Sequence, residues 1–317
     1  MGFAKLSLQP FTMTPHDTAS EDGHIVEIVC RDGIRLGGHL WRAKADARAK
    51  VIINSATGVL SRYYHRYARF LTEHNFDVLT YDYRGIGASR PERLRGCGYR
   101  WRDWGEQDFD AALRFIHDHG APSPMMVVGH SIGGFLPGLA PSAPLVSRML
   151  TVGAQYAWWG DYAPRSRLQL FLKWHVFMPG VTAALGFFPG RRFGWFEDLP
   201  AGVANEWSFH GPKFERSFPR EKRDDAVARM AAITAPVLAI AVADDEIATP
   251  QAIRRTLRYY SGAEQTLVLI KPSDYGRESI GHFRLFHGSH APDFWQDTIL
   301  WLRDGISPWA ASGETTR

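Results

Sequence analysis

Cysteine is scarce in this sequence, because only Cys30 and Cys97 occur among 317 residues. Two cysteines cannot form the disulfide framework of a small secreted domain, and this predicts a reducing compartment. The first residues, MGFAKLSLQPF, lack the apolar core of roughly 7–15 residues that a signal peptide needs. The longest clean apolar run, at residues 236–243, is too short to span a bilayer. We therefore expect a cytoplasmic protein without a membrane-spanning segment.

A strong excess of one charge is also missing. Lys and Arg total 37 against 33 Asp and Glu, which gives a net charge of +4 and a pI near 9.1. A nucleic-acid-binding protein concentrates its basic residues in a patch, whereas here acids and bases alternate, as in residues 220–225. We expect no nucleic-acid partner. The composition, 45% hydrophobic and 22% charged, is typical of a globular protein and excludes a disordered or fibrous chain.

Hydrophobic periodicity predicts strands that alternate with helices. The turn signal Asp32-Gly33 between two apolar stretches indicates a β-hairpin over residues 24–41. Further strands are expected at residues 51–53, 78–81, 125–128, 149–152, 237–242 and 266–270, with helices at 63–74, 104–119 and 291–303. This alternation predicts an α/β fold with a mostly parallel central sheet that is covered on both faces.

One segment interrupts the alternation. Residues 156–218 hold 16 of the 41 aromatic residues in about a fifth of the chain. Such a segment is either an aromatic packing layer or a cap over a pocket, and its place between two strands favours the cap. The expected organisation is a lead-in at 1–22, a core in two parts at 23–155 and 233–304, a cap insertion at 156–232, and a tail at 305–317.

The segment Gly129-His130-Ser131-Ile132-Gly133 is the strongest chemical signal. It follows the apolar strand at 125–128 and precedes a stretch that favours a helix, which is the context that the G-x-S-x-G pattern requires. The small residues on both sides permit a strained turn that exposes the serine hydroxyl, and a helix N-terminus favours negative charge there. Ser131 is therefore the candidate nucleophile. Pro137 and Pro141 predict that the following helix is short or irregular.

With this motif the chain resembles the α/β-hydrolase family over residues 24–303. Four more segments carry the resemblance: Asn54–Gly58, Tyr81–Ser89, Asp244–Glu246 and Gly281–Phe283. They stand where the family has its oxyanion loop, its D-x-R-G-x-G-x-S loop, its acid and its histidine. The closest subgroup contains bacterial serine hydrolases inferred from their sequences. The resemblance implies the α/β-hydrolase fold with a cap, and the chain order Ser, Asp, His agrees with the order of this fold's triad.

A serine hydroxyl needs a neighbouring group that takes its proton. The base of the triad is expected to be His282, because it stands where the family has its histidine. His287 and His290 also follow the last strand and remain alternatives. A carboxylate must orient the imidazole, and alignment with the family's loop favours Asp245, with Asp244 as the alternative.

The oxyanion hole is expected to use the backbone N–H groups of Ile132 and Ala56. Asn54-Ser55 replaces the family's usual His-Gly pair, so the loop is expected to depart from the family's geometry. The H-x-x-H spacing of His287 and His290 is a weak metal signal without Cys or a Glu-bearing helix signature, and the Gly85-x-Gly87 pair indicates a tight turn in place of a dinucleotide loop. We expect neither a metal nor another cofactor.

These residues predict a serine hydrolase that cleaves a carboxylic ester, or a related acyl bond, of a small and largely apolar substrate. Two other functions stay open. One is an acyltransferase that uses the same triad, and the other is a non-catalytic ligand-binding protein that keeps the strained turn at Ser131, here called the elbow. Dehalogenase and epoxide hydrolase chemistry is disfavoured, because those members of the fold attack with a carboxylate where this chain has Ser131. The oligomeric state, the acyl chain and the leaving group are not predicted.

Overall fold

The computed structural model describes residues 23–309 and 314–316. The expected lead-in of residues 1–22, including the stretch compared with a signal peptide, lies outside the described residues, as do residues 310–313 and 317 of the expected tail. Within the described ranges, no helix combines the length and the apolar character that crossing a bilayer requires.

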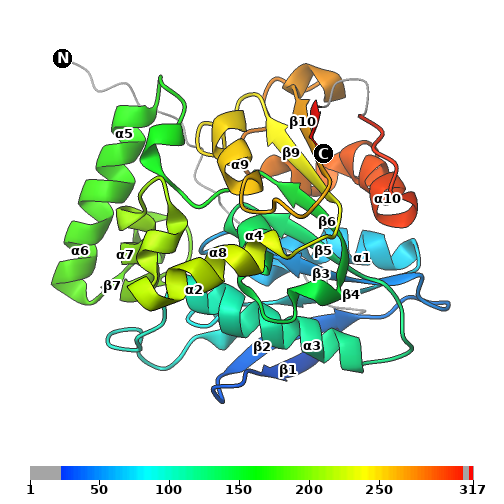
Figure 1. Ribbon diagram of the computed structural model, residues 1–317, viewed down its shortest axis with the longest axis horizontal. Helices are drawn as coiled ribbons and strands as arrows, with labels where there is room; N and C mark the ends of the chain where they lie inside the picture. Colours follow the sequence, from blue (N-terminus) through cyan, green and yellow to red (C-terminus); the bar gives the residue numbers. More distant parts are fainter. Residues whose placement is uncertain (1–22, 310–313, 317) are drawn as a thin grey trace.

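A nine-stranded sheet forms the centre of the described structure, in the order β1-β2-β4-β3-β5-β6-β9-β10-β11 (Figure 1). The six strands from β4 to β10 in this order are parallel, whereas β1, β2 and β11 pair antiparallel. The strands are β1 (Gly23–Val29), β2 (Arg35–Trp41), β3 (Ala49–Asn54), β4 (Phe76–Tyr81), β5 (Met125–His130), β6 (Val146–Val152), β9 (Val237–Val242), β10 (Gln265–Ile270) and β11 (Glu314–Thr316). The mostly parallel sheet expected from the sequence is confirmed.

The first hairpin turns at the predicted position. Val29 pairs with Arg35, and Gly33 adopts a φ of 81°, which lies in the left-handed region where glycine meets no steric penalty. β2 then pairs antiparallel with β4, so the hairpin extends the parallel sheet at one edge.

Two separate hydrophobic cores lie on the two faces of the sheet. Successive side chains of a strand point to opposite faces, and accordingly Val51 and Ile53 of β3 contribute to one core while Ile52 contributes to the other. The helices of the described residues are α1 (His65–Glu73), α2 (Trp101–Asp103), α3 (Asp110–Asp118), α4 (Ile132–Phe135), α5 (Arg167–Phe171), α6 (Met178–Leu185), α7 (Ala201–Phe209), α8 (Arg223–Ala231), α9 (Pro250–Leu257) and α10 (Phe294–Asp304). α1 and α10 cover one face, and α3, α4, α8 and α9 cover the other.

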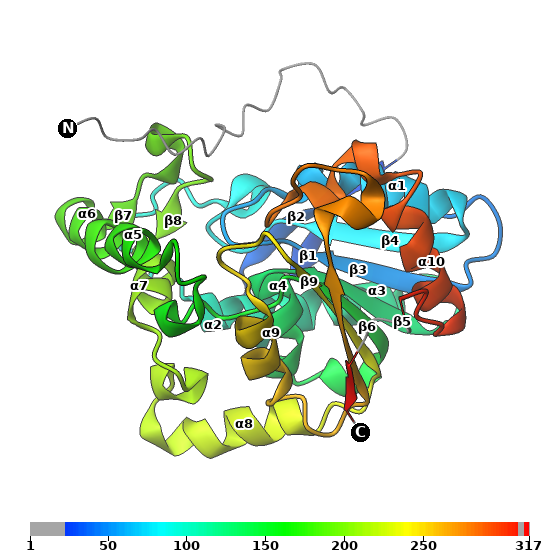
Figure 2. The same cartoon turned by 90° about the horizontal axis from the view of Figure 1, so that it is seen from above.

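The segment between β6 and β9 lies largely to one side of the sheet. Both views show α5, α6 and α7 together there, beside the two-stranded sheet of β7 (Phe187–Phe188) and β8 (Leu199–Pro200) (Figures 1 and 2). α8 instead packs against the core on one face of the sheet, where Met230 contacts the turn at Gly138. The three helices α5 to α7 thus form a cap-like body beside the sheet.

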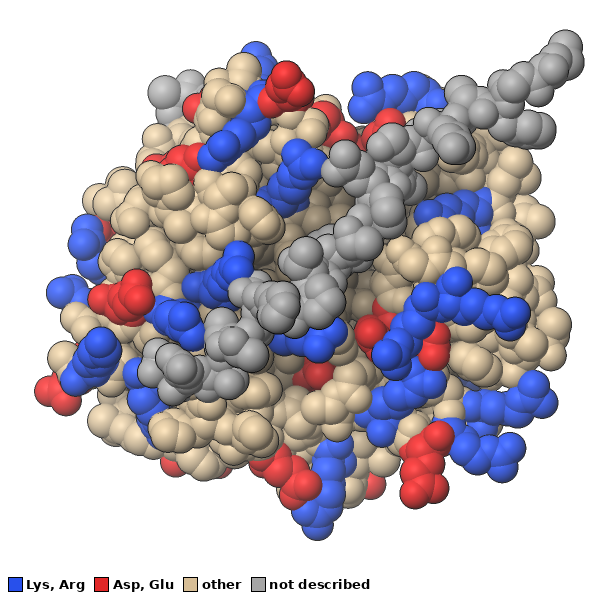
Figure 3. Space-filling model, turned by 180° about the vertical axis from the view of Figure 1, so that it is seen from behind, with Lys and Arg blue, Asp and Glu red and all other residues tan. Residues whose placement is uncertain are grey.

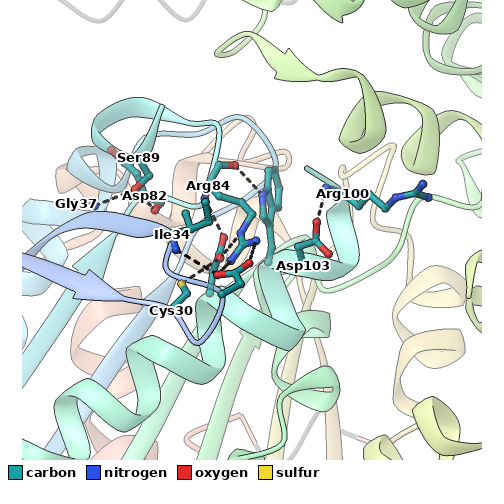
Figure 4. A network of polar contacts seen from close by, with 11 residues as sticks. Cys30, Ile34, Gly37, Asp82, Arg84, Ser89, Arg100 and Asp103 are labelled. Atoms are coloured by element: carbon teal, nitrogen blue, oxygen red, sulfur yellow. Dashed lines mark hydrogen bonds and ion pairs between the residues drawn. The ribbon is translucent and has the colours of Figure 1, made fainter. Parts of the chain in front are cut away.

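A buried polar network joins the hairpin, the loop after β4 and the π-helical turn over Trp104–Phe109 (Figure 4). The backbone N and the Nε of Arg84 donate to Asp108 at 2.9 and 2.6 Å, and its Nη1 donates to Asp32 at 2.6 Å. Burial raises the pKa of Asp108 to about 6, so the carboxylate still carries its charge at neutral pH. The arginine of the D-x-R-G segment therefore holds three chain segments together.

The two glycines in the same loop serve a tight turn, as predicted. Gly85 and Gly87 have φ values of 87° and 47°, and a Cβ on Gly87 would lie 2.1 Å from Oδ2 of Asp82. That carboxylate accepts hydrogen bonds from the N–H groups of Ser61 and Ala88 at 2.7 and 2.8 Å. The turn thus wraps closely around the Asp82 side chain.

Charged side chains of both signs are interspersed on the surface. The face drawn in Figure 3 carries Lys and Arg over most of its extent, with Asp and Glu among them. Ion pairs between exposed side chains, such as that of Arg35 and Glu27, occur on this kind of surface.

Replacing Asp108 by Asn tests the buried network. The variant keeps the shape of the side chain but leaves the Arg84 guanidinium with Asp32 as its remaining carboxylate partner. We expect a loss of about 3 kcal/mol in the free energy of unfolding, since breaking a buried pair leaves a charge uncompensated. Urea denaturation measures it.

The matched control is Glu27→Gln, which removes one partner of the exposed Arg35–Glu27 pair. Its expected effect is below about 1 kcal/mol. Equal effects of the two variants would contradict the structural role of the Arg84 network.

Candidate active site

Ser131 occupies a strained turn between β5 and α4. Its backbone has φ 56° and ψ −125°, a conformation that costs a non-glycine residue free energy and that is found mostly at functional sites. A Cβ on Gly129 would lie 2.4 Å from the Cα of Gly134, and one on Gly133 would lie 2.3 Å from the carbonyl oxygen of Asn54. Both glycines of the G-x-S-x-G segment are therefore required sterically, and they turn the serine out at the end of the strand.

The imidazole of His282 meets the carboxylate of Asp245. Nδ1 of His282 lies 2.6 Å from Oδ2 of Asp245, and both side chains are buried. The other carboxylate oxygen accepts from the N–H groups of Ile247 and Ala248, each at 2.9 Å. Because a carboxylate can only accept, Nδ1 carries the proton and Nε2 is left as the basic nitrogen.

The pKa of Asp245 reflects these contacts. Burial acts to raise it, but the charge and hydrogen bond of His282 and the two backbone N–H groups outweigh burial and hold the pKa below its usual value. The carboxylate is therefore charged near pH 7 and can stabilise an imidazolium at His282.

Asp244, the alternative acid, serves the backbone. Its two carboxylate oxygens accept from the N–H groups of Ile280 and Gly281 at 2.9 and 3.0 Å. It thereby anchors the loop that carries His282, which adopts a left-handed conformation at Gly281 with φ 61°.

Two parts of His282, its carbonyl oxygen and its ring, lie next to residues near the elbow. Its carbonyl oxygen is 2.8 Å from Nε2 of His130, the residue before Ser131, and its ring lies next to Gly153, where a Cβ would be 3.2 Å from Cε1. Gly153 in turn follows Val152, whose carbonyl accepts from the N–H of Ser131 at 2.8 Å. The structure therefore brings the three predicted residues Ser131, His282 and Asp245 into one neighbourhood.

A chain of hydrogen bonds through two buried rings connects this neighbourhood to the oxyanion loop. The carbonyl of His282 can only accept, so Nε2 of His130 donates to it and Nδ1 accepts from the Tyr64 hydroxyl at 2.7 Å. Tyr64 accepts in turn from the N–H of Ala56 at 3.1 Å. Burial and the neighbouring His282 lower the pKa of His130 to about 3, so the ring stays neutral and keeps this direction of donation. The motif gives no signal of this role of Tyr64.

The two residues predicted for the oxyanion hole lie on either side of the nucleophile. Ile132 is the first residue of α4, and the first N–H groups of a helix have no partner within it. The N–H of Ala56 is donated to Tyr64, so an oxyanion there would share or replace that hydroxyl as acceptor. Asn54, which stands in place of the family's His, donates from Nδ2 to the carbonyl of Gly133 at 3.2 Å and thus ties the loop to the elbow.

Gln155 is a residue near the nucleophile that the sequence analysis missed. It is buried, and its Nε2 lies 3.4 Å from Oγ of Ser131. It belongs to no motif, and a glutamine a few residues beyond a strand is not a signal on its own.

The remaining histidines after the last strand lie apart from this arrangement. Nδ1 of His290 is 2.9 Å from Asp293, and Nδ1 of His287 is 2.9 Å from the hydroxyl of Ser289. In residues 23–309, no group of three or more His, Cys, Asp or Glu side chains is placed to hold a metal ion.

A cavity of about 230 Å³ lies between the oxyanion loop, the cap and the residue after His282. Its lining is mostly apolar, with one charged side chain of each sign: Gly58, Val59, Leu60, Tyr63, Arg191, Gly194, Trp195, Phe196, Glu197 and Phe283. The N–H of Glu197 donates to the carbonyl of Gly58 at 2.9 Å, which joins the cap to the loop.

The cap aromatics both pack on each other and line this cavity. The rings of Trp174 and Trp207 are 4.8 Å apart, and Phe196 stacks on Trp207 at 5.8 Å. Trp174 and Trp207 are buried in this cluster, whereas Trp195 and Phe196 reach the cavity. The aromatic segment therefore contains both packed residues and residues that line a cavity, and its role as a cap stays a prediction.

Comparisons with known proteins agree with the fold. A family model described as "Hydrolase_4: Serine aminopeptidase, S33" matches residues 45–176. A soluble variant of monoglyceride lipase from Saccharomyces cerevisiae has a TM-score of 0.62 at 16% identity, over 89% of this chain and 96% of the lipase. Residues 45–176 are thus similar to this family, and the described residues have the α/β-hydrolase fold.

Two further solved structures are similar to this chain. An esterase of Pyrococcus furiosus matches with a TM-score of 0.52 at 14% identity, over 88% of this chain and 90% of the esterase. An α/β hydrolase from Penicillium sp. sh18 matches with 0.57 at 17%, over 90% and 99%. No curated protein matches the chain. These neighbours share the α/β-hydrolase fold of the described residues.

The variants Asp245→Asn and Asp244→Asn separate the two carboxylates. We expect Asp245→Asn to lower kcat by about 10³–10⁴-fold, because an amide no longer fixes the tautomer and stabilises the imidazolium. Asp244→Asn keeps the imidazole contact and loses one backbone hydrogen bond, which predicts about 1–2 kcal/mol of lost stability and a fall in kcat below tenfold. Steady-state kinetics and thermal unfolding measure both. A larger loss of kcat in Asp244→Asn would contradict the assignment of Asp245.

Proposed function

We propose that this α/β-hydrolase cleaves a carboxylic ester, or a related acyl bond, of a small and largely apolar substrate through Ser131, His282 and Asp245. The observation that carries the proposal is the 2.6 Å contact of His282 with Asp245 beside a serine held in a strained turn. A hydroxyl at neutral pH is a poor nucleophile, and this pair supplies the base that activates it.

In the proposed reaction each of these groups has one role. Oγ of Ser131 attacks the substrate carbonyl carbon while its proton moves to Nε2 of His282. The N–H groups of Ile132 and Ala56 stabilise the oxyanion. The proton then passes to the leaving alcohol, and an acyl-enzyme remains. Water attacks this ester with His282 again as base, which releases the acid and restores the serine.

The cavity supports a small substrate. Its volume of about 230 Å³ is below the roughly 300–1,000 Å³ typical of pockets for drug-sized ligands. Aromatic and aliphatic walls favour an apolar acyl or alcohol group, and the names of the esterase and lipase neighbours support an ester as the bond. In this proposal the segment 156–232 supplies the cap that shapes the pocket through its part from α5 to α7, whereas α8 at its end packs against the core.

Two further parts of the proposal concern the location of the protein in the cell and the kind of partner that it binds. The free thiols of Cys30 and Cys97 support a reducing, cytoplasmic location. The mixed charges of the surface support a small molecule as partner in preference to nucleic acid.

A short-chain nitrophenyl ester and a fluorophosphonate probe test the reaction. The wild type should hydrolyse the ester and be labelled at Ser131, whereas Ser131→Ala should lose labelling and at least about 10³-fold in kcat, because the nucleophile is removed. Ser273→Ala, an exposed serine, is the control and should behave as the wild type.

Mass spectrometry locates the adduct, and product analysis with added alcohol or thiol reports the fate of the acyl group. An unlabelled wild type would contradict a working triad, as expected of a ligand-binding protein. A product that carries the acyl group on the added acceptor in place of free acid would favour an acyltransferase.

A larger side chain in the wall of the cavity, which reduces its volume, tests whether the substrate binds there. Val59→Trp places a large ring in the cavity. It should lower kcat/KM for a hexanoyl ester at least about tenfold relative to an acetyl ester, because the ring removes the space in which the additional methylene groups of the longer acyl chain would make contacts. Val176→Trp, at a half-exposed cap position, is the control. An unchanged chain-length preference in Val59→Trp would place the substrate elsewhere.

A further inference from the structure

Gln155 lies where the chain leaves β6 and passes the nucleophile. It follows Val152, whose carbonyl accepts from the N–H of Ser131, by three residues, and the residue is only 5% exposed. Its Nε2 is 3.4 Å from Oγ of Ser131. Among the described side chains, this is the one with a hydrogen bond to that oxygen.

The orientation of the Gln155 amide is determined by a second contact. Its Oε1 accepts a short hydrogen bond from the N–H of Ala157. An N–H group can bond only to the oxygen of an amide, so the NH₂ end must face the serine. Gln155 therefore presents a donor to Oγ of Ser131.

The backbone on both sides of Gln155 is held in unusual conformations. Ala157 has φ 61°, which is costly for a residue with a Cβ, and Gly153 has φ 59° beside the ring of His282. Such strain persists only where the surroundings over-determine it, and it concentrates at functional sites. The segment 153–157 thus places one amide at the nucleophile and leaves room for the base next to it.

We propose that Gln155 is a further catalytic residue, whose side-chain amide donates a hydrogen bond to Oγ of Ser131 and stabilises the negative charge that this oxygen carries during the reaction. The inference rests on the proposed function, because it concerns the same serine. It differs from the oxyanion hole, whose donors act on the carbonyl oxygen of the substrate.

The step is balanced without the transfer of a proton by Gln155. In acylation the Oγ–H bond breaks, its proton moves to Nε2 of His282, and the Oγ–C bond forms. His282 then passes this proton to the leaving alcohol as the bond between the carbonyl carbon and the alcohol oxygen breaks. In deacylation His282 takes a proton from the attacking water, and this proton moves to Oγ as the Oγ–C bond breaks. At both points Oγ has alkoxide character, and the amide N–H stays bonded to nitrogen and supplies the donor.

Two substitutions separate a donor from a merely structural residue. Gln155→Glu keeps an oxygen for the N–H of Ala157 but presents an acceptor to Ser131. Gln155→Leu removes both contacts. If the donor matters, both variants lose activity; if Gln155 only holds the strained segment, Gln155→Leu alone does.

We expect kcat for a nitrophenyl ester to fall about 10- to 100-fold in Gln155→Leu, the range expected for a hydrogen bond to a charged group, and by at least as much in Gln155→Glu, with KM changed less than about threefold. Labelling of Ser131 by a fluorophosphonate should slow by a similar factor and still reach completion. Gln296→Glu and Gln296→Leu, at an exposed position of α10, are the matched controls and should match the wild type.

Several results would overturn the inference. If kcat of Gln155→Glu is within about twofold of the wild-type value, Gln155 does not act as a donor. This holds whether or not Gln155→Leu loses activity. Incomplete labelling together with a lowered melting temperature in both variants would assign it a structural role instead. In all of these cases a wild type labelled at Ser131 would still support the proposed function, whereas an unlabelled wild type would refute the function itself.

Discussion

The backbone conformation of Ser131 is the constraint around which the rest of the molecule is arranged. A left-handed turn between β5 and α4 brings the elbow so close to the end of β3 that Gly133 touches the carbonyl of Asn54. This close packing is possible only because the sheet is parallel at this point, so that β3 and β5 end at the same edge. The strain is therefore sustained by the sheet, whose strands are fully buried and cannot relax.

Hydrogen bonds between loops carry this constraint outward. Tyr64 and His130 link the N–H of Ala56 to the carbonyl of His282, although the three loops are separated by many residues in the sequence. Asp244 fixes the loop of His282 from the other side. Each of the three candidate residues thus follows a different strand, and the fit between their loops depends on buried polar contacts whose loss would leave unsatisfied groups.

The sequence was sufficient for the sheet, the elbow and the short, Pro-interrupted helix after it, because each has a local cause: apolar periodicity, small residues around Ser131, and Pro137. It also predicted the contact of His282 with a carboxylate, but left Asp244 and Asp245 open. Adjacent residues differ by a single step along the chain, and only the three-dimensional loop shows that one faces the ring and the other the backbone. Gln155 and Tyr64 escaped detection because their partners are distant in the sequence and no spacing records them.

The aromatic residues of the segment divide into a buried cluster and a set that lines the cavity. Trp174 and Trp207 are buried in the cap and stabilise it by stacking, which leaves Trp195 and Phe196 on a rigid support at the cavity. The N–H of Glu197 joins that support to Gly58 in the oxyanion loop. In the proposed function, changes in the aromatic residues at the cavity would therefore alter the substrate while Ser131, His282 and Asp245 stay in place, and this would separate the determinants of specificity from those of catalysis.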